Sequence, residues 1–175
     1  MNTTPFEHFC RELAQRFGGG EPNERELQAI GATLRQLCAG IDPAAIADLA
    51  ATAGQERLHP VVPGKFGGPA LYVVSDGAGI ISAPHEHRTW VAIVGLRGIE
   101  VNTIFRRDFR RDSTSTRAVV REREVAVGPG DLLVLDAAQI HATRVDGEAS
   151  TVHVHLYGRA LSALPPFAQR CFNAR

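Results

Sequence analysis

From residue 55 onward the sequence breaks into short segments rich in Val, Ile and Thr, separated by Gly, Pro and Asp. Segments of this kind are typical of β-strands bounded by turns. The expected strands are residues 70–76, 80–83, 85–95, 98–106, 116–124, 132–136, 141–145 and 151–157. About eight short antiparallel strands in one compact domain predict a mainly β jelly-roll barrel, also called a double-stranded β-helix. Small barrels of this kind can hold one ligand inside.

The sequence before residue 55 has the spacing of helices instead. The apolar residues that share one face of the first predicted helix are Phe6, Phe9, Leu13 and Phe17. Asn23 and Glu26 form a capping-box pattern at the start of a second helix, and Asp42 is placed to cap a short third one. We therefore expect an N-terminal helical segment, residues 1–54, packed on a barrel domain, residues 55–175.

The composition limits the classes of partner. The chain has 175 residues and equal numbers, 19 each, of basic and acidic residues, so no basic excess favours nucleic acid or an anionic membrane. We find no signal-peptide pattern and no apolar run of membrane-spanning length. The three cysteines are widely spaced, which argues for a reducing compartment. These features predict a cytoplasmic protein that binds neither nucleic acid nor membrane, and a homodimer stays an open alternative.

Histidines mark the candidate functional site. His85 and His87 are two residues apart, so on a strand their side chains point the same way, with Glu86 turned away. His141 follows a later predicted strand and can supply a third imidazole. Neutral imidazole is the commonest protein ligand of zinc, iron, copper and nickel. The pattern predicts a three-histidine metal site with its far side open to a substrate.

The same region lacks a suitable carboxylate ligand. Apolar residues fill positions 90–93, where many β-barrel metal sites have a Glu, and Glu100 lies beyond the turn expected at Gly98. A neutral three-histidine face favours an anionic substrate such as a thiolate that binds the ion directly. Octahedral Fe(II) with room for a thiol and O₂, and tetrahedral Zn²⁺ with a bound water, both fit this spacing.

A second group of polar residues lies near the C-terminus. His153, His155 and Tyr157 alternate along one predicted strand and therefore share one face. Two imidazoles and a phenol in a barrel that already holds three histidines indicate a functional interior. We expect Tyr157 to donate a hydrogen bond to bound O₂ or substrate, and His155 to orient Tyr157.

Taken together, these motifs resemble the thiol dioxygenases of the cupin superfamily, which include cysteine dioxygenase and bacterial 3-mercaptopropionate dioxygenase. The residues that carry the resemblance are Pro84, His85, His87, Trp90, Gly98, His141, His155, Tyr157 and Gly158. The resemblance covers roughly residues 55–175. It implies a cupin barrel, a mononuclear Fe(II) held by His85, His87 and His141, and oxidation of a small thiol to its sulfinate by O₂.

The resemblance also implies roles for other residues. The family's Ser-x-His-x-Tyr network falls on His153, His155 and Tyr157, with His153 in place of the serine. The family's thiol substrates carry a carboxylate, which calls for an arginine. Arg170 matches the position of that arginine in the mercaptopropionate enzymes.

Other residues and other functions stay open at this point. Arg57 matches the arginine position of cysteine dioxygenase loosely, and Arg159 is a third candidate for the carboxylate contact. The departure at His153 keeps two alternatives: a metal-dependent cupin that binds or senses a ligand without turnover, and a cupin enzyme of another reaction class that uses zinc or iron.

Overall fold

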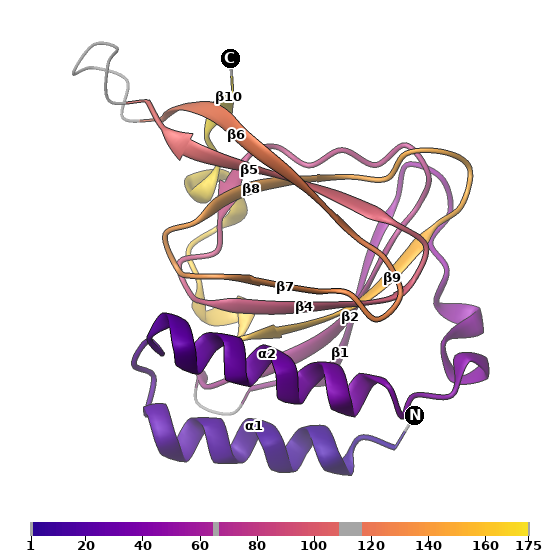
Figure 1. The fold of residues 1–175 in the computed structure, drawn as a ribbon, viewed down its shortest axis with the longest axis vertical. Coiled ribbons are helices and arrows are strands. Elements are labelled where there is room, and N and C mark those ends of the chain that lie inside the picture. The colour runs from indigo at the N-terminus through magenta and orange to yellow at the C-terminus, as the bar shows by residue number, and fades with distance from the viewer. Residues whose placement is uncertain (1, 65–66, 109–116, 175) are drawn as a thin grey trace.

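The computed structural model describes residues 2–64, 67–108 and 117–174 (Figure 1). Two helices, α1 (Thr4–Phe17) and α2 (Glu24–Cys38), and a 3-10 helix, η1 (Pro43–Leu49), precede the strands. The strands are β1 (Glu56–Val62), β2 (Ala70–Asp76), β3 (His85–Glu86), β4 (Val91–Arg97), β5 (Glu100–Arg107), β6 (Ala118–Val127), β7 (Leu132–Leu135), β8 (Ile140–Arg144), β9 (Thr151–Tyr157) and β10 (Asn173–Ala174). Two further 3-10 helices, η3 (Leu161–Ala163) and η4 (Phe167–Arg170), lie between β9 and β10.

The strands form two five-stranded sheets that face each other. The first sheet has the order β1-β2-β9-β4-β7, and the second has the order β10-β6-β5-β8-β3. After β2 the chain crosses between the sheets at every connection except that between β5 and β6. This alternation produces a double-stranded β-helix, and Figure 1 shows the two sheets curling around a common interior. The predicted fold class, a mainly β jelly roll with N-terminal helices, is confirmed.

Several predicted strands differ from the observed ones. The prediction of one strand over residues 85–95 is wrong, because β3 and β4 belong to different sheets. The chain turns between them at Arg88, which has a positive φ of 60°. Residues 80–83 form no strand but a single bridge from Ile81 to Arg144. The Arg-rich stretch of residues 106–112, which the sequence predicts to be an exposed hairpin extension, lies partly outside the described residues.

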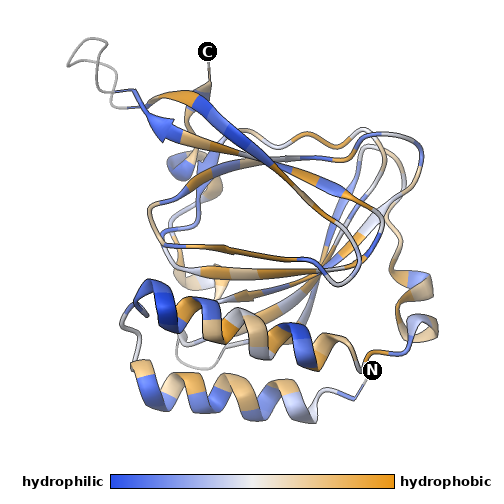
Figure 2. Cartoon of the chain, viewed as in Figure 1, coloured by the Kyte–Doolittle hydropathy of each residue, from blue (hydrophilic) through white to orange (hydrophobic). Residues whose placement is uncertain are grey.

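The helices cover the outer face of the first sheet. At the start of α2, Asn23 Oδ1 accepts from the Glu26 amide and Glu26 Oε2 accepts from the Asn23 amide, each at 3.0 Å, which confirms the predicted capping box. Helix α2 packs on β4 and β7, two strands that are strongly hydrophobic in Figure 2. Leu27, Ile30 and Leu34 of this helix are buried in the shared core.

Gly31 allows α2 to lie close to the sheet. A Cβ added at this residue would come within 2.8 Å of Val134 Cγ1 and 2.9 Å of Leu132 Cδ2. We expect Gly31→Val to lower the free energy of unfolding by about 1–3 kcal/mol, because it overpacks this contact. Urea denaturation followed by circular dichroism measures the change. Gln36→Val, on the exposed side of the same helix, should cost less than about 1 kcal/mol, and equal losses in the two variants would contradict the close packing.

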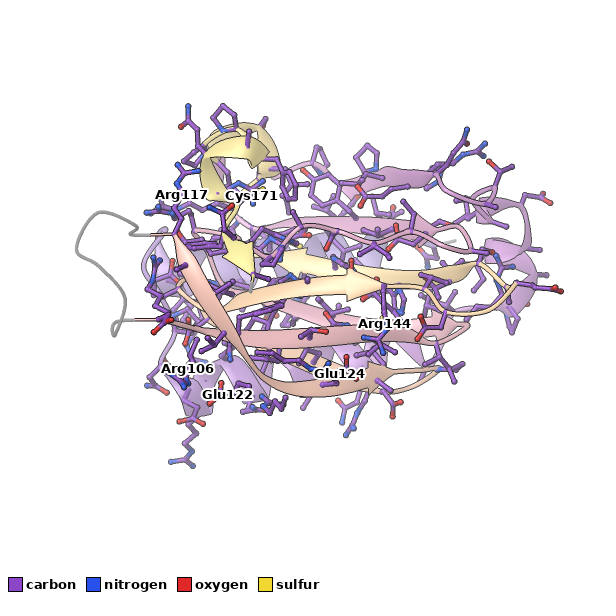
Figure 3. All side chains as sticks on the ribbon, turned by 90° about the horizontal axis from the view of Figure 1, so that it is seen from above. Arg106, Arg117, Glu122, Glu124, Arg144 and Cys171 are labelled. Atoms are coloured by element: carbon purple, nitrogen blue, oxygen red, sulfur yellow. The ribbon has the colours of Figure 1, made fainter. Side chains whose placement is uncertain are left out.

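The outer face of the second sheet is polar. Arg144 on β8 pairs with Glu124 on β6 and, at 3.0 Å, with Asp146, and Figure 3 shows Arg144 and Glu124 together on this face. Within the described ranges, no helix combines the length and the hydropathy that a bilayer span requires.

A candidate metal centre inside the barrel

Three histidines from separate parts of the chain meet inside the barrel. The pairing of β3 with β8 places His85 opposite His141. His87 follows β3 directly, and its ring centroid lies 4.9 Å from that of His85 and 5.0 Å from that of His141. One candidate ligand atom from each residue falls within 4.8 Å of the other two. In the described part of the chain, no other His, Cys, Asp or Glu group has this geometry.

Hydrogen bonds fix the orientation of two of the rings. His85 Nδ1 donates to the Ala83 carbonyl at 2.9 Å, and His141 Nδ1 donates to Asn102 Oδ1 at 2.8 Å. Each Nδ1 faces a carbonyl oxygen and therefore carries the proton, which leaves a lone pair on Nε2. Asn102 is itself held, because its Nδ2 donates to Glu100 Oε1 at 2.9 Å.

The three side chains fit a divalent metal ion. His87 Nε2 and His141 Nε2 lie 2.9 Å apart, and two nitrogens bound to one metal ion at about 2.0–2.1 Å are separated by about 2.9 Å in octahedral geometry and about 3.3 Å in tetrahedral geometry. Burial lowers the pKa of His85 to about 4. Burial, together with the neighbouring imidazoles, holds the pKa values of His87 and His141 well below their ordinary value. All three rings are therefore neutral at pH 7 and able to bind a metal.

Glu86, between the two neighbouring histidines, is turned away from them. Its buried carboxylate pairs with Arg88 and, at 2.7 Å, with Arg107. Its backbone carbonyl accepts a hydrogen bond from Arg170 Nη1 at 3.1 Å. The residue that separates the two imidazoles thus also holds one of the predicted substrate-binding arginines.

Sequence reasoning missed Asn102, and it excluded Glu100 as a metal ligand without foreseeing that Glu100 supports Asn102. Both are buried, and they alternate with half-buried residues along β5, so two polar residues at inward-facing positions were the available signal.

We expect Asn102→Ala to weaken metal binding about 10–100-fold, because His141 loses the acceptor that orients it. Competition against a chelator of known affinity measures the change. Thr103→Ala, at the next position on β5, is the control, and metal affinity equal to that of the unchanged protein in both variants would argue against the role of Asn102.

A cavity of about 120 Å³ opens beside the three histidines. Arg170 lines it and is 8% exposed, and its Nε donates to the Pro165 carbonyl at 3.0 Å. Arg57 lies between two cavity-lining residues of β1, Glu56 and Leu58, and so faces the other side of that strand. Arg159 is exposed and donates to the Gly19 carbonyl at 3.1 Å. Of the three predicted arginines, the structure brings Arg170 to the histidines.

The histidines and tyrosine of β9 separate into two environments. His155 Nδ1 and Tyr157 Oη lie 3.0 Å apart, and both residues line the cavity. Burial lowers the pKa of His155 to about 3 and raises the pKa of Tyr157, so both are neutral at pH 7. His153 is buried beyond them, with Nε2 3.4 Å from the Val127 carbonyl, and its ring centroid is 6.2 Å from that of His155.

The far end of the cavity is acidic, which the sequence did not reveal. Asp76 and Glu100 line it, are 2% and 1% exposed, and have their carboxyl groups within hydrogen-bonding contact. Burial and the hydrogen bond to Glu100 raise the pKa of Asp76 to about 7. Two buried carboxyl groups in contact retain one proton between them, since both cannot ionise without strong repulsion.

This pair gives the stability a defined pH dependence. The pKa of Asp76 is about 7 in the folded chain, against an ordinary value of 3.8. The unfolded chain therefore loses its proton first, and the free energy of unfolding should fall as the pH rises from about 4 to about 7, then level off. We expect Asp76→Asn to remove this fall and to be about 2–4 kcal/mol more stable than the unchanged protein at pH 8. Urea denaturation between pH 4 and pH 8 measures it, and parallel curves for the two proteins would contradict it.

Comparisons with known proteins concern the fold alone. No family model and no curated protein matches the sequence. Among solved structures, the polyketide cyclase RemF from Streptomyces resistomycificus is 14% identical, with 70% of this chain and 76% of that chain covered and a TM-score of 0.49. A cupin 2 conserved barrel domain protein from Leptotrichia buccalis is 14% identical, with 67% and 47% covered and a TM-score of 0.49.

A third neighbour is an RmlC-like cupin family protein with a double-stranded β-helix fold from Methanocaldococcus jannaschii. It is 8% identical, with 63% of this chain and 85% of that chain covered, and the TM-score is 0.46. Similarity at this level bears on neither reaction nor substrate. The fold assignment depends on the strand order of this chain, and the candidate metal site depends on its three histidines.

Proposed function

We propose that the protein is an iron-dependent thiol dioxygenase that converts a small carboxylate-bearing thiol, such as cysteine or 3-mercaptopropionate, to its sulfinate. The reaction, RSH + O₂ → RSO₂H, places both oxygen atoms of O₂ on the sulfur. The observation that carries the proposal is one small cavity that joins three neutral histidines to a buried arginine. The absence of a carboxylate from the three-histidine group supports an anionic sulfur ligand.

His85, His87 and His141 would hold the ferrous ion through nitrogens that are deprotonated at neutral pH. When bound, iron supplies the redox chemistry that a thiol and O₂ need to react. Because three imidazoles add no charge, an anionic substrate gains electrostatic energy on approaching the site. The bonds from His85 and His141 to Ala83 and Asn102 hold two of the rings in the orientation that the ion requires.

The remaining cavity residues bind the substrate and hold protons. Arg170 keeps its positive charge beside the histidines and can pair with a carboxylate through Nη2, which makes no hydrogen bond to a described residue. Tyr157 retains its proton at neutral pH and can donate it in a hydrogen bond to an oxygen atom in the cavity. His155 contacts the Tyr157 hydroxyl and sets its direction. His153 lies farther along β9, with its ring centroid 6.2 Å from that of His155, and we expect it to act on the reaction through His155.

The reaction belongs in a reducing compartment, and we therefore place it in the cytoplasm. Cys10, Cys38 and Cys171 are all free thiols, which agrees with such a compartment. Small thiols and O₂ are the partners that the reaction needs.

Oxygen uptake by the iron-loaded protein tests the proposal. With cysteine and 3-mercaptopropionate we expect one O₂ consumed per sulfinate formed, and ¹⁸O₂ should add two labelled oxygens to the product. Metal analysis of protein purified from its native host should find iron rather than zinc. If no small thiol consumes O₂, the proposal is refuted, and thiol binding without turnover would instead favour a ligand-sensing protein.

A further inference from the structure

One end of the cavity has a chemistry that the proposed reaction does not use. Glu56, Asp76 and Glu100 form this end, which we name the acid recess, while Arg170 lines the same cavity beside the histidines.

The strand register gives the distance between the acid recess and the histidines. Asp76 lies four residues beyond Tyr72, the Cα partner of His155. Glu100 lies four residues before Ile104, the Cα partner of His141. Four strand residues span about 13 Å. The Glu100 side chain shortens this separation by reaching back to Asn102, so the acid recess lies on the order of 10 Å from the histidines.

The buried carboxyl oxygens of this end have no partner beyond each other. Asp76 Oδ1 and Glu100 Oε2 line the cavity and, apart from the contact between the two carboxyl groups, form no hydrogen bond. Thr151 Oγ1 and His153 Nδ1, which do not line the cavity, are also buried without a partner. Asp76 and Glu100 face each other and can share only one proton, which leaves net negative charge. In native proteins, unsatisfied buried polar groups are few, and a bound water or ion commonly explains them.

No cation of the chain neutralises the acid recess. Within residues 2–64, 67–108 and 117–174, no Lys, Arg or His forms a salt bridge with Glu56, Asp76 or Glu100. His153, which interacts electrostatically with Asp76, is kept neutral because burial lowers its pKa. Buried carboxylates without a paired cation are costly, so a positive group supplied by a ligand would offset this cost.

We propose that the acid recess binds the protonated amine of an elongated ligand whose other end occupies the histidine site. This inference rests on the proposed function for the assignment of sulfur to the histidine end. The ligand class is a short thiol that carries an ammonium group four or five carbons from its sulfur. An ammonium group has three donors for the unpaired oxygens of Asp76 and Glu100, and Glu56 lies exposed at the cavity mouth, where the amine enters.

The geometry favours an ammonium group over a second metal ion. A metal site needs several donor atoms close together, and the potential donors of Asp76, Glu100 and His153 do not meet the 4.8 Å separation that His85, His87 and His141 satisfy. The cavity volume of about 120 Å³ limits the ligand to a single short chain.

Two ligand series titrated into cobalt(II)-loaded protein test the inference without turnover. The series are n-alkanethiols and ω-aminoalkanethiols of two to six carbons, followed by calorimetry and by thiolate-to-cobalt absorption. We expect the amino series to bind at least about tenfold more tightly at four or five carbons. In Asp76→Asn and in Glu56→Gln, this advantage should fall below about threefold. Glu122→Gln, on the exposed face of β6 (Figure 3), should keep it.

The outcomes separate the two proposals. Equal affinities for the two series, or an advantage that peaks at two carbons and survives both variants, would overturn the amine site, because chelation at the metal explains that pattern. If no thiol produces the absorption band, sulfur binding at the histidines fails instead. Calorimetry with n-butylamine then decides the amine site separately: heat of binding that Asp76→Asn abolishes supports it, and its absence overturns it. Glu56 is exposed, so its variant tests the amine site without changing a buried residue.

Discussion

His141→Ala is expected to lose its bound iron and to reduce thiol-dependent oxygen uptake by about a thousandfold or more. The substitution removes one of three donor nitrogens, and His87 Nε2 then loses the atom that faces it at 2.9 Å. It also leaves Asn102 Oδ1 buried without its donor. Two imidazoles alone bind a divalent ion weakly, so dialysis should strip the metal from this variant.

Metal content per chain after dialysis and the oxygen electrode together measure this effect. His8→Ala is a matched control, since His8 is 66% exposed on α1 and contacts Glu12 rather than the cavity. The control should retain full metal content and activity. Full metal content in His141→Ala would show that His141 is not a ligand, and the proposed reaction would then lose its basis.

Arg170→Met is expected to raise the KM for 3-mercaptopropionate by about a hundredfold, with a smaller change in kcat. A charge-assisted pair between a buried guanidinium and a carboxylate contributes about 2–5 kcal/mol, and each 1.4 kcal/mol corresponds to about tenfold in affinity. A thiol without a carboxylate, such as 2-mercaptoethanol, lacks this pair, so its kcat/KM should change less than about threefold. The test therefore compares how much Arg170→Met lowers kcat/KM for 3-mercaptopropionate and how much it lowers kcat/KM for 2-mercaptoethanol.

Two further variants distinguish carboxylate binding by Arg170 from a purely structural role of this residue. Arg170→Lys keeps the charge but loses the planar fork, so its KM should fall between those of the unchanged protein and Arg170→Met. Arg159→Met removes an exposed arginine that contacts the Gly19 carbonyl, and both thiols should react as before. A parallel loss for both thiols in Arg170→Met would indicate that the residue only supports the Glu86 carbonyl.

The sequence predicted the barrel well because its signals are local. Gly and Pro punctuation located most strands, and the capping box located the start of α2. Strand β1 was missed because all seven of its residues are exposed or half-buried on one edge of the sheet, apart from any apolar run. The division of residues 85–95 was missed because a crossover at one residue, Arg88, leaves no compositional trace.

The convergence of His85 and His87 was predicted correctly, but the argument from strand alternation explains it only in part. Strand alternation was expected to align His85 with His87, yet β3 ends at Glu86, and the turn after it brings His87 to the same point. Asp76 and Glu100 were not foreseen as a pair, because they lie on β2 and β5, in opposite sheets. Only the three-dimensional arrangement of those sheets brings the two carboxyl groups together.

The wall of the cavity that faces the histidines comes from the segment after β9. Leu161, Phe167 and Arg170 all follow β9, and the Phe172 amide attaches this segment to the Pro84 carbonyl at 2.7 Å. The ion-binding nitrogens, by contrast, belong to the barrel strands and the residue after β3. Carboxylate recognition by Arg170 and metal retention are thus encoded in different stretches of sequence, and exchanging the segment after β9 between related barrels is expected to change the first while sparing the second.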